Sequence, residues 1–194
     1  MAPRAFHLSE LPHRQLAKAR RSGELVRVKA GWYLWRAELP IDQYERAMAL
    51  HVVKIRVHAR SLPYGVNISH FSAGMVLGFP QVYKAGDVEV TDFRRAQFTR
   101  EGIRVYRRPS MKPMIVLRDA IRTTSIPMTA IEMMRKLDPP NALVIADYAL
   151  RVGCQLNRLK AVNDELQLPR MRAQTSRILD LAEPGAESPH QNRS

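Results

Sequence analysis

The segment from His13 to Arg36 constrains the fold most, because its pattern changes abruptly from helical to strand-like. It reads HRQLAKARRSGELVRVKAGWYLWR, a basic stretch that is interrupted at Ser22-Gly23 and turns again at Gly31. A glycine that follows a helix readily takes the left-handed conformation that ends it. The alternating apolar residues beyond Gly23 favour two strands joined by a turn. The segment therefore predicts a short helix followed by a two-stranded hairpin.

Within this predicted helix, apolar and basic residues fall on opposite faces. Leu16, together with Ala17 or Ala19, is spaced to turn inward, and the polar side chains recur outward at three-to-four spacing. A helix followed by a basic hairpin is the outline of a winged helix-turn-helix, which places its second helix in the major groove of DNA. A complete module needs another helix first, and Leu8-Ser9-Glu10-Leu11 leaves room for a turn only. We therefore expect a minimal module.

The predicted interface with double-stranded DNA uses the helix and the hairpin. Arg14 and Gln15 are candidates for reading bases, because these side chain types pair bidentately with guanine and adenine, while Lys18 and Arg21 suit phosphate anchors. On the hairpin, Arg27 and Lys29 should share one face by the period of two. The whole predicted set is His13, Arg14, Gln15, Lys18, Arg20, Arg21, Arg27, Lys29 and Arg36. The alternative is that these charges only solvate a surface.

The overall charge supports a polyanionic partner. The chain has 31 Lys plus Arg against 18 Asp plus Glu, for a formal net charge of +13, and such an excess attracts nucleic acid through counterion release and steering. A membrane surface has the same attraction. No apolar run approaches the roughly 20 residues that span a bilayer, and the N-terminus lacks the apolar core of a signal peptide. We expect a cytoplasmic protein with no membrane partner.

Beyond Leu39-Pro40 the pattern changes, and we expect an α+β fold in three parts. These are a DNA-binding module (1–38), an alpha/beta domain (39–182) with a small antiparallel or mixed sheet and C-terminal helices, and a flexible tail (183–194). The second part should open with a long helix that has one apolar face and a capping box from Asp42 and Glu45. Further helices are expected at 70–77, from 127, and at 142–152 (capped by Asn141), 155–167 and 171–182. Strands are expected at 88–91, 103–106, 114–117 and 121–126.

The sequence gives no sign of catalysis. It has no Gly-rich phosphate loop, HExxH or GxSxG motif, and the lone Cys154 excludes an internal disulfide and a cysteine-based zinc site. His51 and His70 lie on predicted apolar surfaces, where a histidine is more often a hydrogen-bonded core group than a metal ligand. We expect no enzyme, no cofactor, no metal site and no catalytic residues.

A second basic segment lies between residues 94 and 108. Its arginines are Arg94, Arg95, Arg100, Arg104, Arg107 and Arg108, and Glu101 is the one acid among them. In the predicted strand, Arg104 and Tyr106 should share a face opposite Ile103 and Val105. If that face lies beside the hairpin, it would extend a positive track along DNA. The alternatives are a charged sheet edge that discourages strand pairing and a surface for an acidic partner.

The order of several blocks resembles that of the AbiEi-like antitoxin family. The blocks are the hairpin, SHFSAGMVLGFP, VEVT, TTSIPMT and LVIADYALRVG, and the resemblance covers most of residues 9–188. In that family a winged helix ending in a Gly-x-Tyr wing, matched here by Gly31-Trp32-Tyr33, precedes a larger alpha/beta domain. The resemblance implies an autorepressor that binds operator repeats and partners a nucleotidyltransferase-like toxin in a type IV toxin-antitoxin system. It thus implies operator DNA and a cognate toxin as partners.

The chain departs from the family pattern at several places. Met128 stands where relatives usually have arginine, and Glu132 where they have aspartate. Many relatives resemble fusions with a very-short-patch-repair-like nuclease domain after a Glu-Ser motif; Glu187-Ser188 matches that junction and only six residues follow it, so we expect that domain to be lacking. The rival function is a protein-interaction module that neutralises a toxin with little specific DNA binding. The sequence leaves the operator and the oligomeric state open.

Overall fold

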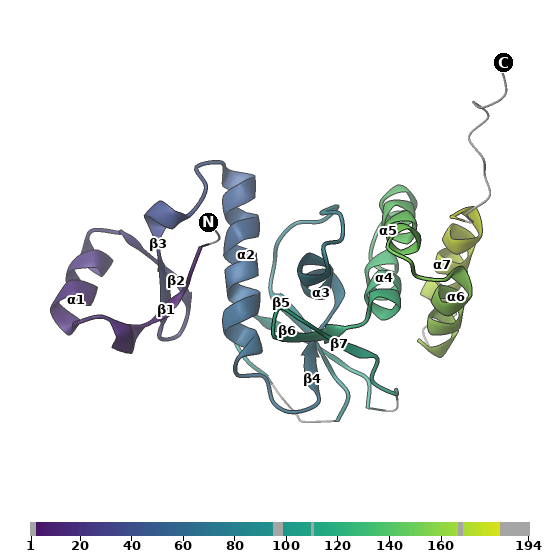
Figure 1. The fold of residues 1–194 in the computed structure, drawn as a ribbon, viewed down its shortest axis with the longest axis horizontal. Helices are drawn as coiled ribbons and strands as arrows, with labels where there is room; N and C mark the ends of the chain where they lie inside the picture. Colours follow the sequence, from purple (N-terminus) through teal and green to yellow (C-terminus); the bar gives the residue numbers. More distant parts are fainter. Residues whose placement is uncertain (1–2, 95–98, 110, 167–168, 183–194) are drawn as a thin grey trace, which may run out of the picture.

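The computed structural model describes residues 3–94, 99–109, 111–166 and 169–182. Within these ranges the chain forms seven α-helices and two β-sheets (Figure 1). This confirms the predicted α+β class. The expected tail, 183–194, and Arg95 lie outside the described residues.

The N-terminal unit contains the predicted helix and hairpin. Its elements are β1 (Phe6–His7), the 3-10 turn η1 (Leu8–Glu10), α1 (His13–Arg21), β2 (Leu25–Lys29), β3 (Trp32–Trp35) and the 3-10 turn η2 (Arg36–Glu38). The strands form an antiparallel sheet in the order β1-β3-β2. In the described part of the chain only β1 and one 3-10 turn precede α1. The Leu8–Leu11 segment forms no α-helix, as expected, so a complete winged helix is not confirmed.

Helix α1 ends at a glycine cap. Gly23 has φ +72°, and the Glu24 N–H donates to the Ala19 carbonyl over 3.0 Å, which closes the left-handed cap that the Ser22-Gly23 break predicted. Leu16 and Ala19 are buried. The expected inward face of α1 is confirmed.

Helix α2 (Gln43–Ala59) is buried on two sides. It begins where the Asp42 carboxylate accepts the Glu45 N–H over 2.8 Å. Val53 and Val57 pack against the hairpin, and Ile55 packs against the larger sheet. The expected single apolar face is therefore wrong, because the helix lies between two sheets (Figure 1).

The larger sheet is mixed, as expected, with strand order β6-β5-β4-β8-β7. Its strands are β4 (Val66–Ile68), β5 (Val88–Asp92), β6 (Ile103–Arg107), β7 (Ile115–Arg118) and β8 (Ile121–Thr124). The central strand β4 pairs antiparallel with β5 and parallel with β8. It has three residues, which is too short to produce a recognisable alternating pattern.

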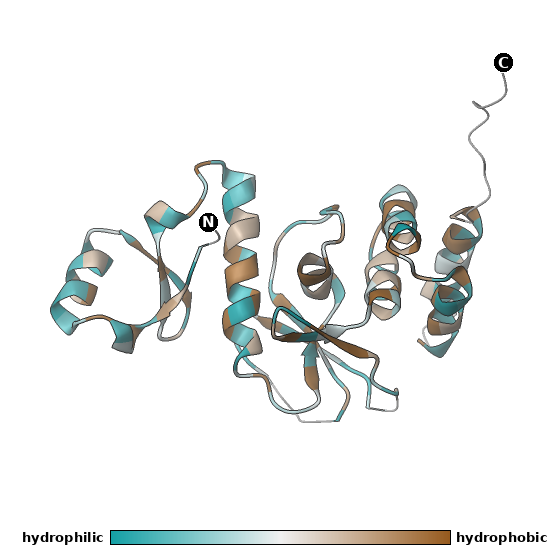
Figure 2. Ribbon diagram, in the orientation of Figure 1, coloured by the Kyte–Doolittle hydropathy of each residue, from teal (hydrophilic) through white to brown (hydrophobic). Residues whose placement is uncertain are grey.

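The remaining helices build the main core. They are α3 (His70–Leu77), α4 (Ile126–Met134), α5 (Pro139–Arg151), α6 (Leu156–Glu165) and α7 (Pro169–Leu181). Helix α5 begins earlier than expected, after Asp138 instead of Asn141, because proline is tolerated in the first turn of a helix. Figure 2 shows that α3 is largely hydrophobic and α1 largely hydrophilic. Over the described residues no helix is both long and apolar enough to cross a membrane.

Arg135, which follows α4, joins α4 to α6. Its side chain is 5% exposed, and its Nη2 donates to the Asn163 side chain and backbone oxygens over 2.8 and 2.6 Å. Its Nη1 donates to the Leu166 carbonyl. Burial lowers the pKa of Arg135 to about 10, so the guanidinium remains charged at neutral pH.

Replacing Arg135 by methionine should destabilise the protein. The substitution leaves the buried oxygens of Asn163 and Leu166 without donors, and we expect the free energy of unfolding to fall by about 2–4 kcal/mol. Urea denaturation measures this change, with the exposed Arg151→Met as the matched control. A loss no larger than that of the control would contradict a bridging role for Arg135.

Candidate nucleic-acid interface

The outer face of α1 carries the predicted base-reading and phosphate-anchoring residues. Arg14, Gln15, Lys18 and Arg21 are all exposed, whereas Leu16 and Ala19 are buried. The helix lies at one extreme of the molecule, and the hairpin separates it from α2 (Figure 1). The face is therefore accessible to a large partner. His13 is also exposed at the start of the helix.

Two of the other predicted DNA ligands make contacts inside the N-terminal unit. Arg20 lies with its Cζ 5.7 Å from the centre of the Tyr33 ring. Arg36 donates from Nε to the Gly23 carbonyl over 2.8 Å, and from its backbone N–H to the Glu24 carbonyl over 2.7 Å. Arg36 thus ties the end of the hairpin to the end of α1, although its side chain is exposed.

Lys29 does not share a face with Arg27 as expected. The pairing of β2 with β3 shifts register between Arg27 and Lys29, and such a bulge breaks the alternation of side chains. Arg27 is exposed, whereas Lys29 is half-buried and its Nζ donates to the Ser61 hydroxyl over 3.1 Å. Lys29 therefore points to the C-terminal end of α2.

Arg100 meets Lys29 at this place. Its Nη1 donates to the same Ser61 hydroxyl over 2.7 Å, so the second basic segment reaches the base of the hairpin. Burial and the neighbouring Arg100 lower the pKa of Lys29. Burial, Lys29, Arg100 and Lys54 lower the pKa of His58 to about 4. We call Lys29, Ser61 and Arg100 the junction; it is a concentration of positive charge beside the hairpin.

The other arginines of the second segment do not form one surface. Arg104 lies on the face of the sheet that carries Tyr106, whose interaction raises the pKa of Arg104. Arg107 lines a shallow hollow with Ile103 and Val105, on the opposite face. The shared face of Arg104 and Tyr106 was predicted, but it is Arg100 that lies beside the hairpin.

Two further arginines of this segment point elsewhere. Arg94 stacks over Tyr64, with 4.7 Å from its Cζ to the ring centre. Arg108 turns inward: its side chain is 19% exposed and its Nε lies 4.0 Å from Glu132 Oε1. Arg108 therefore neutralises a buried carboxylate instead of extending the basic surface.

The sequence did not reveal a pair of buried carboxylates at the start of α3. Glu132 Oε2 accepts the His70 backbone N–H over 3.2 Å, and Glu89 Oε2 accepts the Phe71 N–H over 2.8 Å. Such N–H groups at a helix start have no partner within the helix and favour negative charge. His70 has φ +52° and stacks on Tyr106 with ring centres 3.7 Å apart, so the surrounding contacts hold a strained backbone.

Glu132 is fully enclosed by the protein. Burial raises its pKa to about 7, against the opposing effects of the His70 N–H and Arg108. Met128, the other departure from the family pattern, is fully buried in the core. Both positions therefore belong to the packed interior.

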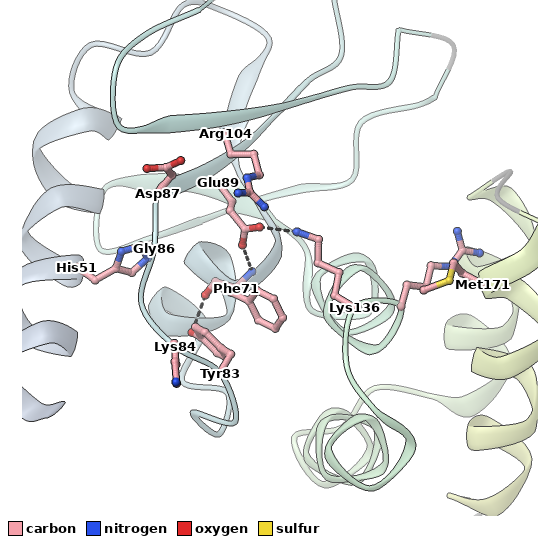
Figure 3. A pocket seen from close by; sticks show the side chains of 11 residues that line it. His51, Phe71, Tyr83, Lys84, Gly86, Asp87, Glu89, Arg104, Lys136 and Met171 are labelled. Carbon is pink, nitrogen blue, oxygen red and sulfur yellow. Dashed lines mark hydrogen bonds and ion pairs between the residues drawn. The ribbon is translucent and has the colours of Figure 1, made fainter.

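A cavity of about 540 Å³ opens beside Glu89. Figure 3 shows Glu89, Lys136 and Arg104 on one side of it and the Phe71 and Tyr83 rings on another. Glu89 Oε1 accepts from Lys136 Nζ over 2.5 Å and from the Tyr106 hydroxyl over 2.8 Å. The central carboxylate and ammonium groups thus satisfy each other.

The two histidines that the sequence singled out are buried core groups. His51 bonds the Ser72 hydroxyl over 3.2 Å, and His70 bonds the Ser69 hydroxyl over 2.9 Å. Burial is the main cause that lowers the pKa of each ring. The described residues contain no group of three His, Cys, Asp or Glu side chains that could hold a metal ion.

Comparisons with known proteins show a shared fold. No family model and no curated protein matches the chain. The chain is similar to the crystal structure of the RV2827C protein from Mycobacterium tuberculosis, with a TM-score of 0.56 and 14% sequence identity, covering 93% of this chain and 73% of that chain. At this identity the likeness concerns the fold alone.

Glu132→Gln should change how stability depends on pH. The folded-state pKa of about 7 lies above the ordinary 4.5, so between these values the unfolded chain releases a proton that the folded protein keeps. The wild type should therefore lose stability relative to the variant as pH rises from 4.5 to 7, by up to about 1.4 kcal/mol per pH unit.

Urea denaturation of both proteins across this pH range measures the difference. The buried histidines titrate in both proteins, so subtraction removes their main effect. A difference that stays constant with pH would show that the Glu132 carboxyl titrates as an ordinary acid.

Proposed function

We propose that the protein is a sequence-specific DNA-binding regulator, an antitoxin-like autorepressor. The observation that supports this most is the outer face of α1, where Arg14, Gln15, Lys18 and Arg21 are exposed together at the end of the molecule. A helix with this face fits the major groove, where arginine and glutamine can pair with base edges.

The hairpin and the junction fit the phosphate backbone beside such a groove. Arg27 is exposed on the hairpin, and Lys29 and Arg100 converge on Ser61 at its base. Charges of this kind neutralise phosphates without reading sequence. Helix α1 would thus supply sequence specificity, and the hairpin would supply affinity for any DNA sequence.

The antitoxin part of the proposal comes from the resemblance to the AbiEi-like family. Under this proposal the operator lies upstream of the protein's own gene, and a nucleotidyltransferase-like toxin is the second partner. The N-terminal unit would bind the operator, and the alpha/beta domain would be available to the toxin.

Arg14→Ala plus Gln15→Ala should remove sequence preference. Fluorescence anisotropy of the purified protein with its own upstream DNA and with a scrambled duplex, across a salt series, measures the effect. We expect the wild type to prefer its own DNA and the variant to bind both alike. If about six phosphates are neutralised, the logarithm of affinity should fall with the logarithm of salt at a slope near −5.

Arg118→Ala is the matched control for that experiment, because it removes one positive charge from an exposed residue of β7. It should keep the preference for the protein's own DNA. Equal binding of both duplexes by the wild type would reduce the interaction to bulk electrostatics and contradict specific repression.

Arg100→Gln should weaken binding to the two duplexes equally. The removal of a phosphate contact lowers general affinity and makes the salt slope shallower by about 1, without changing preference. Arg104→Gln, on the opposite face of the sheet from the Ile103 hollow, is the control and should leave the slope unchanged. The same anisotropy assay measures both variants, and a larger effect of Arg104→Gln would place the phosphate path on the other face.

A second candidate function is the capture of a protein partner, favoured by one edge of the larger sheet. Strand β7 ends the strand order, and its Val116 and Leu117 are 37% and 71% exposed. An edge strand with exposed apolar side chains can pair with another chain. Neutralisation of a toxin there would need little specific DNA binding, and a complex that survives high salt would distinguish this function from the first.

A further inference from the structure

A cavity between the N-terminal segment and α2 is surrounded by three arginines. It has a volume of about 320 Å³ and lies between residues 3–5 and the last turns of α2. Val53 and Val57, which belong to the core, line it together with Arg4, Arg56 and Arg60. The rest of the lining is Pro3 and Ala5, so no carboxylate of the described residues lines this cavity.

The three positive charges have no acidic partner among the described residues. The ion pairs among the described residues involve other side chains. Glu38, which lies nearby, accepts the backbone N–H of Arg4 over 2.9 Å. Arg56 lies in the last turn of α2 and Arg60 is its C-cap residue, four positions apart, a spacing at which like charges repel. A ligand of opposite charge would relieve this repulsion.

We propose that this cavity binds a phosphate group. A guanidinium presents parallel N–H donors that match phosphate oxygens, and arginine is the preferred side chain for this recognition. A phosphate monoester carries about two negative charges at neutral pH, whereas a carboxylate carries one. A single phosphate or a diphosphate therefore balances the charge of three guanidiniums better than a single carboxylate. The volume also lies within the range of small-molecule sites.

The position of the cavity gives the ligand a structural effect. Residues 3–5 lead into β1, which pairs with β3 of the hairpin, and the opposite wall belongs to α2. A bound phosphate would therefore tie the N-terminal unit to α2. The phosphate could belong to a free phosphorylated molecule or to a nucleic-acid backbone, and the site itself does not depend on base reading by α1.

Pyrophosphate is the probe for this site. Calorimetric titration at constant ionic strength should show binding to the wild type and to R118Q/R122Q, which loses two exposed charges on the β7–β8 hairpin. R56Q/R60Q should bind at least roughly tenfold more weakly, because charge-assisted hydrogen bonds are lost. Arg60 Cζ lies 5.3 Å from the centre of the Trp32 ring, so tryptophan emission should also change on binding.

The second arm uses a duplex without operator sequence. If pyrophosphate binds without displacing the duplex, and R56Q/R60Q keeps as much duplex affinity as R118Q/R122Q, the site serves a free phosphorylated molecule. If R56Q/R60Q loses more duplex affinity than R118Q/R122Q, with or without pyrophosphate binding, the phosphate is that of the backbone. Equal behaviour of the two double variants toward pyrophosphate and toward the duplex would overturn the proposal, whatever the outcome for Arg14 and Gln15.

Discussion

The burial of α2 on two sides is the constraint on which the rest of the structure depends. Val53 and Val57 contact the small sheet, and Ile55, 1% exposed, contacts the large one. A sheet of a few short strands is marginal in water unless one face is covered, and a helix as short as α1 is marginal alone. The N-terminal unit therefore depends on α2 for its stability.

The packing around the larger sheet depends on charged groups at the start of α3. Glu89 and Glu132 come from a strand and a helix on either side of it, and both accept its first N–H groups. Burying two carboxylates is costly unless hydrogen bonds and cations offset the loss of water. Lys136 and Arg108 supply these cations, so this polar centre fixes how α3, β5 and α4 fit together.

The local features of the fold could be predicted from the sequence. The three-to-four spacing around Leu16 identifies the inner face of α1, and Gly23 identifies its end, because both signals lie within a few residues. Most strands of the large sheet are likewise visible as short apolar runs. The three-residue β4 is not visible in this way, because three residues are too few to distinguish an alternating pattern from a chance arrangement.

Contacts between distant residues could not be predicted. His70 and Glu132 are 62 residues apart, and nothing near either residue indicates the other. The inward turn of Arg108 depends on the same carboxylate. The predicted shared face of Lys29 and Arg27 is wrong for a local reason. The β-bulge between them cannot be recognised from the alternation of residue types in the sequence. The candidate site was therefore predictable on α1 but not at the junction.

Arg36 joins α1 to the hairpin within the N-terminal unit. Its side chain holds the Gly23 carbonyl at the end of α1, and its backbone holds Glu24 at the start of the hairpin. A surface that is already assembled loses little conformational entropy when it docks. Association through α1 and the hairpin should thus be rigid-body docking. Its heat-capacity change should reflect only the surface area buried at the interface, with no contribution from coupled folding.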